Sequence, residues 1–95
     1  MRVEWTQRAR DRLGEIHDFI AQDVPLRART FCEALIAAAD GLARFPYRAP
    51  LLPEDSAYRQ LVVAGYRVVY RVTAEVIYIA TVVPPRQQVP SGELR

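Results

Sequence analysis

The segment GYRVVYRV, residues Gly65–Val72, has the period of two that is typical of a β-strand. Successive side chains on a strand point to opposite faces of the sheet. One face of this segment would carry Tyr66, Val68, Tyr70 and Val72, and the other would carry Arg67, Val69 and Arg71. The segment therefore predicts a half-buried strand, in which the tyrosine and valine face contacts a core and the arginine face is open.

Two further strands flank this segment. The same period of two predicts strands at about 58–64, 66–73 and 76–83, with Gly65 in the first turn and the sequence TAE in the second. The prolines Pro84 and Pro85 end the last strand, because proline cannot donate to a β-ladder. We expect Ile77 and Ile79 on the core face of this antiparallel meander. On the open face, Tyr78, Ala80 and Val82 would join Arg67, Val69 and Arg71.

The N-terminal half predicts a short strand and two helices. The segment at 2–5 alternates like an edge strand, and Thr6 follows it at a favourable N-cap position. Apolar residues then recur with helical spacing at Ala9, Leu13, Ile16 and Ile20. The predicted helix ends near Asp23. Pro25 suits the first turn of a second helix, which would extend to about Ala43. Because the connection is short, the two helices should form an antiparallel hairpin.

These elements define an α+β fold of order β-α-α-β-β-β, in which the helix hairpin covers one face of the sheet. The proline-rich segment at 44–57 is predicted as an irregular loop between the helices and the meander. We expect one domain at 1–83 and a loose, polar C-terminal tail at 84–95. The chain has 95 residues, which leaves room for one core and no enclosed cofactor cavity.

The composition excludes several classes of protein. All thirteen basic residues are arginine, and the formal net charge is +2. Arginine binds anions through a planar fork and is a poor proton-transfer group, because its pKa lies above about 12. The single cysteine, Cys32, precludes an internal disulfide and is expected to pack as a small apolar residue. Without a signal peptide or an apolar run of about 20 residues, we expect a soluble, cytoplasmic protein.

Few residues are suited to catalysis or metal binding. His17 is the only histidine, and we expect it at a helix surface. One histidine, one cysteine and scattered carboxylates do not make a zinc site at the usual spacings, so we expect no metal and no cofactor. The candidate anion-binding face consists of Arg59, Arg67, Arg71, Tyr78 and Arg86. An ordinary solvated face with paired charges is an equally good interpretation of these residues.

The helix hairpin offers a second candidate surface. Most of the large aromatic residues, Trp5, Phe19, Phe31 and Phe45, are expected in the core, although Phe19 and Ile36 fall outside the main stripes. A helix hairpin on a small sheet often leaves a groove that accepts another chain. The candidate partner-binding residues are Leu13, Phe19, Ile20, Phe31, Leu35 and Ile36.

Three segments together resemble the RelE/ParE toxin superfamily. They are VEWTQRARDRLGEIHDFIA, LARFPYRAPLL and YRQLVVAGYRVVYRVTAEVIYIATVVPPRQ, and they extend from about Val3 to Gln87. The resemblance implies the same β-α-α-β-β-β fold and a bacterial toxin of a type II toxin–antitoxin pair. RelE-like members cleave mRNA on the ribosome, and Arg67 and Arg86 match their two arginine positions. The lysines of those members have no counterpart here, and no tyrosine follows Arg86.

ParE-like members lack that catalytic set and poison DNA gyrase by binding. The VEWT opening, the hairpin and the GYRVVYRV strand are more similar to this branch, although Pro84-Pro85 replaces a common His-Gly pair. The leading hypothesis is a ParE-like toxin of the plasmid-stabilisation type, without catalytic residues. Its implied partners are DNA gyrase and a cognate, ParD-like or similar antitoxin, bound in a hetero-oligomer. The alternatives are a RelE-like ribosome-dependent mRNA endonuclease and a non-toxic relic that still binds antitoxin.

Overall fold

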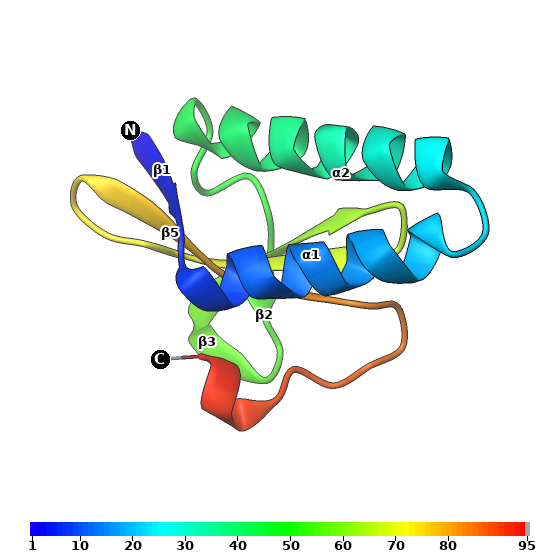
Figure 1. Ribbon diagram of the computed structural model, residues 1–95. Helices are drawn as coiled ribbons and strands as arrows, with labels where there is room; N and C mark the ends of the chain where they lie inside the picture. The colour runs from blue at the N-terminus through cyan, green and yellow to red at the C-terminus, as the bar shows by residue number, and fades with distance from the viewer. Residues whose placement is uncertain (95) are drawn as a thin grey trace.

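The computed structural model describes residues 1–94. Two helices lie on one side of a sheet, and the C-terminal segment lies on the other (Figure 1). The elements in chain order are β1 (Arg2–Trp5), α1 (Gln7–Ala21), α2 (Pro25–Asp40), the 3₁₀ turn η1 (Gly41–Ala43), β2 (Leu51–Leu52), β3 (Asp55–Val63), β4 (Tyr66–Val72), β5 (Val76–Val83) and the 3₁₀ turn η2 (Ser91–Glu93).

The sheet has five strands in the order β1-β5-β4-β3-β2. Strands β3, β4 and β5 form the predicted antiparallel meander, and β1 joins its edge in parallel with β5. The short strand β2 lies inside the segment that was predicted to be irregular, so that prediction was incomplete. Two residues are too few to produce a visible alternation, and β2 exists only because it pairs with β3.

Local signals in the sequence account for the helix boundaries. Thr6 caps α1, since its hydroxyl oxygen accepts a hydrogen bond from the Ala9 N–H at 3.1 Å. The same hydroxyl can donate to the carbonyl of Ile79 at 2.9 Å, which ties the start of α1 to β5. Pro25 occupies the first turn of α2. Helix α1 ends two residues before the expected stop at Asp23, and α2 passes into η1 before Ala43.

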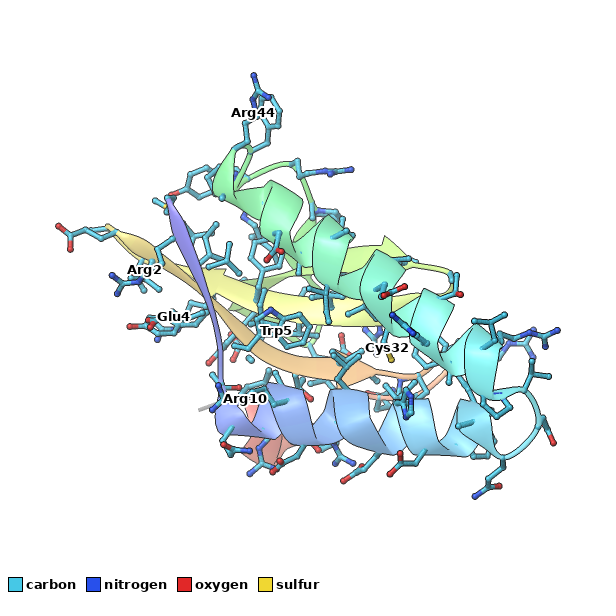
Figure 2. The ribbon with its side chains drawn as sticks, turned by 45° about the horizontal axis from the view of Figure 1, so that its top comes forward. Arg2, Glu4, Trp5, Arg10, Cys32 and Arg44 are labelled. Atoms are coloured by element: carbon cyan, nitrogen blue, oxygen red, sulfur yellow. The ribbon has the colours of Figure 1, made fainter. Side chains whose placement is uncertain are left out.

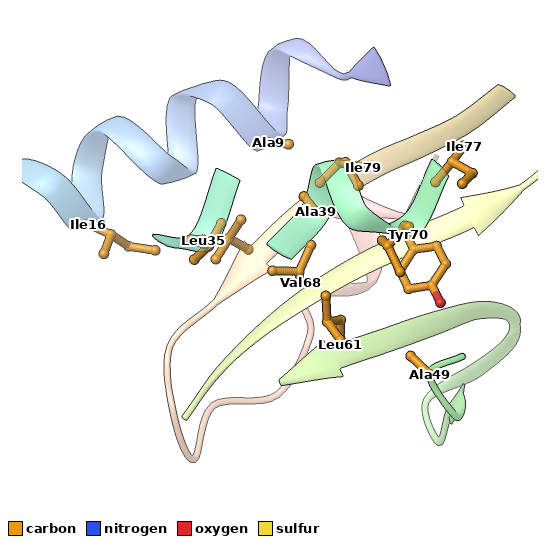
Figure 3. Close-up of a cluster of buried hydrophobic side chains, with 12 residues drawn as sticks. Ala9, Ile16, Leu35, Ala39, Ala49, Leu61, Val68, Tyr70, Ile77 and Ile79 are labelled. Carbon is orange, nitrogen blue, oxygen red and sulfur yellow. The ribbon is translucent and has the colours of Figure 1, made fainter. Parts of the chain in front are cut away.

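The main core lies between the helices and the sheet (Figure 3). Tyr70 and Val68 of the opening strand contribute fully buried side chains to it, together with Leu35 from α2. Trp5 and Phe31 pack against its margin as expected. Phe19 and Phe45 do not, because their side chains are 71% and 62% exposed, and the expectation that Phe45 is a core residue was wrong.

A β-bulge changes which face the end of β5 presents. Val69 pairs with Thr81 and Tyr70 pairs with Ile79, so Ala80 is an extra residue on β5. One inserted residue shifts the alternation by one position. Val82 therefore belongs to the core beneath the helices, whereas it was expected on the open face. Ala80 remains on the face away from the helices.

The face opposite the helices carries a second, smaller core. Its buried members are Leu52, Tyr58, Val69, Ala80, Val83 and Val89, and Leu94 packs against them. Val89 and Leu94 belong to residues 84–94, which we call the C-terminal strap. The expectation of a loose tail was wrong, because these two apolar residues cover the sheet face that strand periodicity left open. A domain that ends at residue 83 is therefore still only a prediction.

Within residues 1–94, neither α1 nor α2 combines the length and apolar character that a bilayer-crossing helix requires.

Candidate functional site

The guanidinium of Arg67 is held by contacts within the chain. Its Nη1 and Nη2 atoms bond to the Glu54 carboxylate oxygens at 3.2 and 3.1 Å, and Nη1 also donates to Gln60 at 3.1 Å. Nη2 donates to the backbone carbonyl of Gln87 in the strap. The Arg67 side chain is only 18% exposed. Its positive charge is therefore neutralised by a neighbouring carboxylate, and its donors point at protein atoms.

Glu54 is the acidic partner in this arrangement. Its carboxylate accepts hydrogen bonds from Arg67 and from the Val89 N–H, the latter at 3.3 Å. The bond from Arg67 keeps the pKa of Glu54 below its usual value, against the opposing effect of desolvation. Glu54 and Arg67 thus join the β2–β3 turn, β4 and the strap. Sequence reasoning missed this pairing, because Glu54 lies in the segment predicted as irregular loop.

The other members of the predicted anion-binding face are dispersed. Arg71 is exposed and lies over the ring of Tyr78, 5.5 Å from its centroid. Arg86 is exposed in a turn, where its backbone φ of 63° falls in the left-handed region. Arg59 pairs with Tyr70 in the β3–β4 ladder, so it lies on the helix side of the sheet and not on the opposite face. The structure therefore does not bring the five residues together as one surface.

Arg59 belongs to a different cluster, which sequence reasoning missed. Its guanidinium lies over the ring of Tyr47 at 5.1 Å and donates to the Ala49 carbonyl at 2.7 Å. Arg44 lies 5.9 Å from the ring centroid of Phe45 in the same loop. The signal that could have revealed this cluster is the sequence RFPYR at 44–48, in which two aromatic residues flank a proline and an arginine lies on the outer side of each.

Glu93 holds the end of the strap against α1. Its side chain is only 4% exposed, and it accepts hydrogen bonds from the Thr81 hydroxyl at 2.6 Å and from Arg12 Nε at 3.1 Å. A second bond runs from Arg12 Nη2 to the other carboxylate oxygen. The bonds from Arg12 keep the pKa of Glu93 below its usual value, although desolvation opposes them. This clasp joins α1, β5 and the strap across 81 residues of sequence.

A cleft of about 340 Å³ lies between α1 and the strap. Its apolar lining includes Ile16, Phe19, Tyr66, Pro84 and Pro90, and the Arg12–Glu93 clasp lies at one side. The ring of Phe31 contacts that of Tyr66 at 4.7 Å between centroids, and this contact extends the apolar surface toward α2. The cleft combines an exposed aromatic side chain with a half-buried apolar floor. Such a surface is suited to receive an apolar side chain of another molecule.

The predicted partner-binding residues separate into three groups. Phe19 lines the cleft, and the half-buried Ile20 and Phe31 pack against the margin of the core. Leu13 and Ile36 line a second hollow on the hairpin with Trp5. Leu35 is fully buried in the core and has no surface to offer to a partner. Leu26, which is 71% exposed, was not among the predicted residues.

Comparison with known proteins identifies the family. The family model described as the ParE toxin of the type II toxin-antitoxin system parDE matches residues 3–89. The chain is also 37% identical, over 81 residues, to Toxin RelE2 of Caulobacter vibrioides, with 84% of this chain and 90% of that protein covered. The chain therefore belongs to the ParE toxin family, and it is a type II toxin–antitoxin toxin of the RelE/ParE superfamily.

Solved structures support the same fold. The chromosomal ParDE toxin–antitoxin system of P. aeruginosa matches with a TM-score of 0.81 at 20% identity, over 90% of this chain and 97% of that chain. The RelBE2 toxin–antitoxin complex of Mycobacterium tuberculosis matches with a TM-score of 0.65 at 26% identity, over 87% and 95%. The strand, the helix hairpin and the antiparallel strands are thus the fold of ParE and RelE toxins.

Proposed function

We propose that this toxin acts by binding a protein target, with DNA gyrase as that target, and that a cognate antitoxin neutralises it. The family match supports a ParE-like activity. The observation that carries the proposal is the engagement of Arg67 by Glu54, Gln60 and the strap. An arginine that stabilised a phosphate during RNA cleavage would have to break these contacts first. In the binding mechanism, Arg67 instead holds the strap in place.

Tyr70 is no better suited to the role of a general base. Tyr70 lies three residues after Arg67 on β4. Its side chain is fully buried, and its hydroxyl donates to the Pro46 carbonyl at 2.8 Å. Desolvation raises the pKa of Tyr70 above its usual value of about 10. A base is most effective when its pKa lies near the working pH. This tyrosine therefore serves the core.

The direct test measures gyrase activity. The full-length toxin, purified away from its antitoxin, should inhibit supercoiling by the gyrase of its own bacterium and should increase the amount of cleaved DNA. The variant Arg67→Gln should retain this inhibition in proportion to the fraction that remains folded, because Arg67 acts through the strap. Unchanged supercoiling and cleavage at a stoichiometric excess of folded toxin would refute the proposal.

The proposed antitoxin contact is the cleft between α1 and the strap, together with the exposed apolar residues of the hairpin. The matching RelBE2 structure is a toxin–antitoxin complex, which supports a partner of this kind. Phe19 is 71% exposed, so Phe19→Asp should leave folding intact. This variant should weaken binding of the antitoxin encoded beside the toxin, as measured by calorimetry. Val62→Asp, at a 60% exposed position of β3, is the matched control and should bind normally.

A RelE-like activity is the second candidate, and the similarity to Toxin RelE2 favours it. In that case the toxin would cut ribosome-bound mRNA, with Arg67 and Arg86 stabilising phosphate charge and a tyrosine as base. Cleavage of mRNA that is lost in Arg67→Gln while the protein stays folded would establish this activity in place of gyrase poisoning. Unimpaired growth on induction without antitoxin would instead identify a non-toxic relic.

A further inference from the structure

The loop that follows η1 presents arginine and aromatic side chains to solvent. Phe45 and Tyr47 are each 62% exposed, and Arg44 and Arg48 beside them are exposed as well. Figure 2 shows Arg44 projecting from the end of α2, away from the body of the molecule. We call residues 44–48 together with Arg59 the basic–aromatic loop.

The backbone of this loop is held in place by contacts with the main core. Pro46 accepts the hydrogen bond of the buried Tyr70 hydroxyl, and Ala49 is only 4% exposed within the main core. The Arg48 N–H donates to the Phe45 carbonyl at 3.2 Å, which closes a turn, and the Gln60 N–H donates to the Pro50 carbonyl at 3.0 Å. The loop is therefore anchored at Pro46, Ala49 and Pro50, while the residues Tyr47 and Arg48 between these anchors are exposed.

Its positive charges have no acidic partners among residues 1–94. None of Arg44, Arg48 and Arg59 forms an ion pair within 4.0 Å in that part of the chain. Arg67 and Arg12, by contrast, are both paired with carboxylates. Two of the unpaired guanidinium groups lie over aromatic rings, at 5.9 Å for Arg44 and 5.1 Å for Arg59. The cluster is thus a platform of planar groups with a local excess of positive charge.

We infer that the basic–aromatic loop binds single-stranded nucleic acid. Exposed rings offer stacking surfaces for unpaired bases, and unpaired arginines offer forks for the phosphates between those bases. Because Phe45 and Tyr47 are each 62% exposed, the platform projects and does not enclose its ligand. This inference does not depend on the function proposed above, because a contact with DNA or RNA is compatible both with gyrase poisoning and with cleavage of ribosome-bound mRNA.

The test is fluorescence anisotropy with labelled 12-nucleotide single strands of DNA and RNA of one sequence, and with the matching duplex. The full-length chain should bind the single strands more tightly than the duplex at 50 mM salt. With three phosphate contacts, affinity should fall roughly 18-fold between 50 and 200 mM salt. The comparison of the DNA and RNA strands identifies which of the two the loop prefers.

Variants separate stacking from charge. Tyr47→Ala should weaken binding at least about fivefold, since a stacked base contributes about 1–3 kcal/mol, whereas Tyr47→Phe keeps the ring and should bind like the parent. Arg44→Gln with Arg48→Gln should reduce the slope of log affinity against log salt by about 1.4. Arg27→Gln with Arg29→Gln removes the same charge from the opposite end of α2 and should leave the slope unchanged.

Three results would overturn the inference. The first is the absence of binding to any strand at 50 mM salt by the folded chain. The second is equal binding by the parent and by Tyr47→Ala, which would reduce the interaction to nonspecific charge. The third is displacement of the labelled strand by polyglutamate as effectively as by an unlabelled strand, which would assign the loop to an acidic protein surface.

Discussion

At the scale of single residues, the turn between β3 and β4 shows how backbone conformation restricts the sequence. Ala64 and Gly65 are its two central residues, and both have positive φ, at 50° and 86°. Two-residue hairpin turns favour this conformation because it matches the twist of the strands. A Cβ added at Gly65 would also lie 3.2 Å from the Pro85 side chain of the strap. Gly65 therefore serves both the turn and the packing of the strap.

Gly65→Ala should lower the free energy of unfolding by about 1–2 kcal/mol, because an L side chain in the left-handed region is strained. Gly14→Ala is the matched control, since Gly14 lies within α1 and a Cβ there meets nothing within 4 Å. The control should stabilise the protein by about 1 kcal/mol through its higher helix propensity. Urea unfolding of both variants measures the difference. A Gly65→Ala protein as stable as the parent would show that the turn tolerates a side chain.

At the scale of elements, two carboxylates hold the strap in place. Glu54 is distant from the strap in sequence, and Glu93 lies in the strap but is distant in sequence from its partner Arg12. Glu54 joins the strap to β4 through Arg67, and Glu93 joins it to α1 through Arg12. Both carboxylates have lowered pKa values because arginine donates hydrogen bonds to them. A group with a lowered folded-state pKa adds stability above its unfolded-state pKa, and this stability is lost as pH falls through the folded-state value.

Glu93→Gln should reduce the free energy of unfolding by about 2 kcal/mol at pH 7, because hydrogen bonds to a buried charged group are lost. The difference from the parent should be constant above about pH 5 and should begin to shrink below about pH 4, where the carboxylate becomes protonated in the unfolded state while it is still charged in the folded state. It should be smallest once the pH has fallen below the folded-state pKa, where the carboxylate is protonated in both states. Urea unfolding between pH 3 and 7 measures it. Glu75→Gln, at an exposed turn position, should change stability by less than about 0.5 kcal/mol. A pH-independent difference for Glu93→Gln would contradict the role assigned to the clasp.

At the scale of the whole molecule, two cores share one sheet. The larger core lies beneath the helices, and the smaller lies beneath the strap. Val68 and Tyr70 of β4 contribute to the first, while Val69 between them contributes to the second. Because neighbouring residues of the same strands belong to both cores, we expect the molecule to unfold in one transition.

A chain truncated after Val83 tests this expectation, together with the domain boundary predicted from sequence. Removal of the strap uncovers the second core, and loss of Val89 and Leu94 alone should cost on the order of 3 kcal/mol. The truncated chain should bind the dye ANS and unfold at a lower urea concentration than the full chain. Gln88→Ala, at an exposed strap position, should change neither property. Equal stability of the truncated and full chains would establish 1–83 as the complete domain.

Local patterns in the sequence were sufficient to predict most of the fold. The period of two in Gly65–Val72 and the apolar stripes on the helices are visible in the sequence because, within each of these elements, buried residues recur at regular intervals. Thr6 and Pro25 act on helix ends through their own backbone neighbours. The candidate site was much less predictable. Arg67 looked like a free anion-binding residue, because its partner Glu54 is 13 positions away in a segment without a pattern.

The order of elements, the helix-facing side of β4 and the resemblance to RelE/ParE toxins could all be predicted from the sequence, because each depends on short-range periodicity or on the order of motifs. The residues that cover the opposite face of the sheet became apparent only in the folded molecule. The bulge at Ala80, the pairing of Arg67 with Glu54 and the clasp of Glu93 by Arg12 and Thr81 join residues that are distant in the chain. Such contacts leave no periodic trace, since they satisfy charges and apolar surface that become neighbours only after folding.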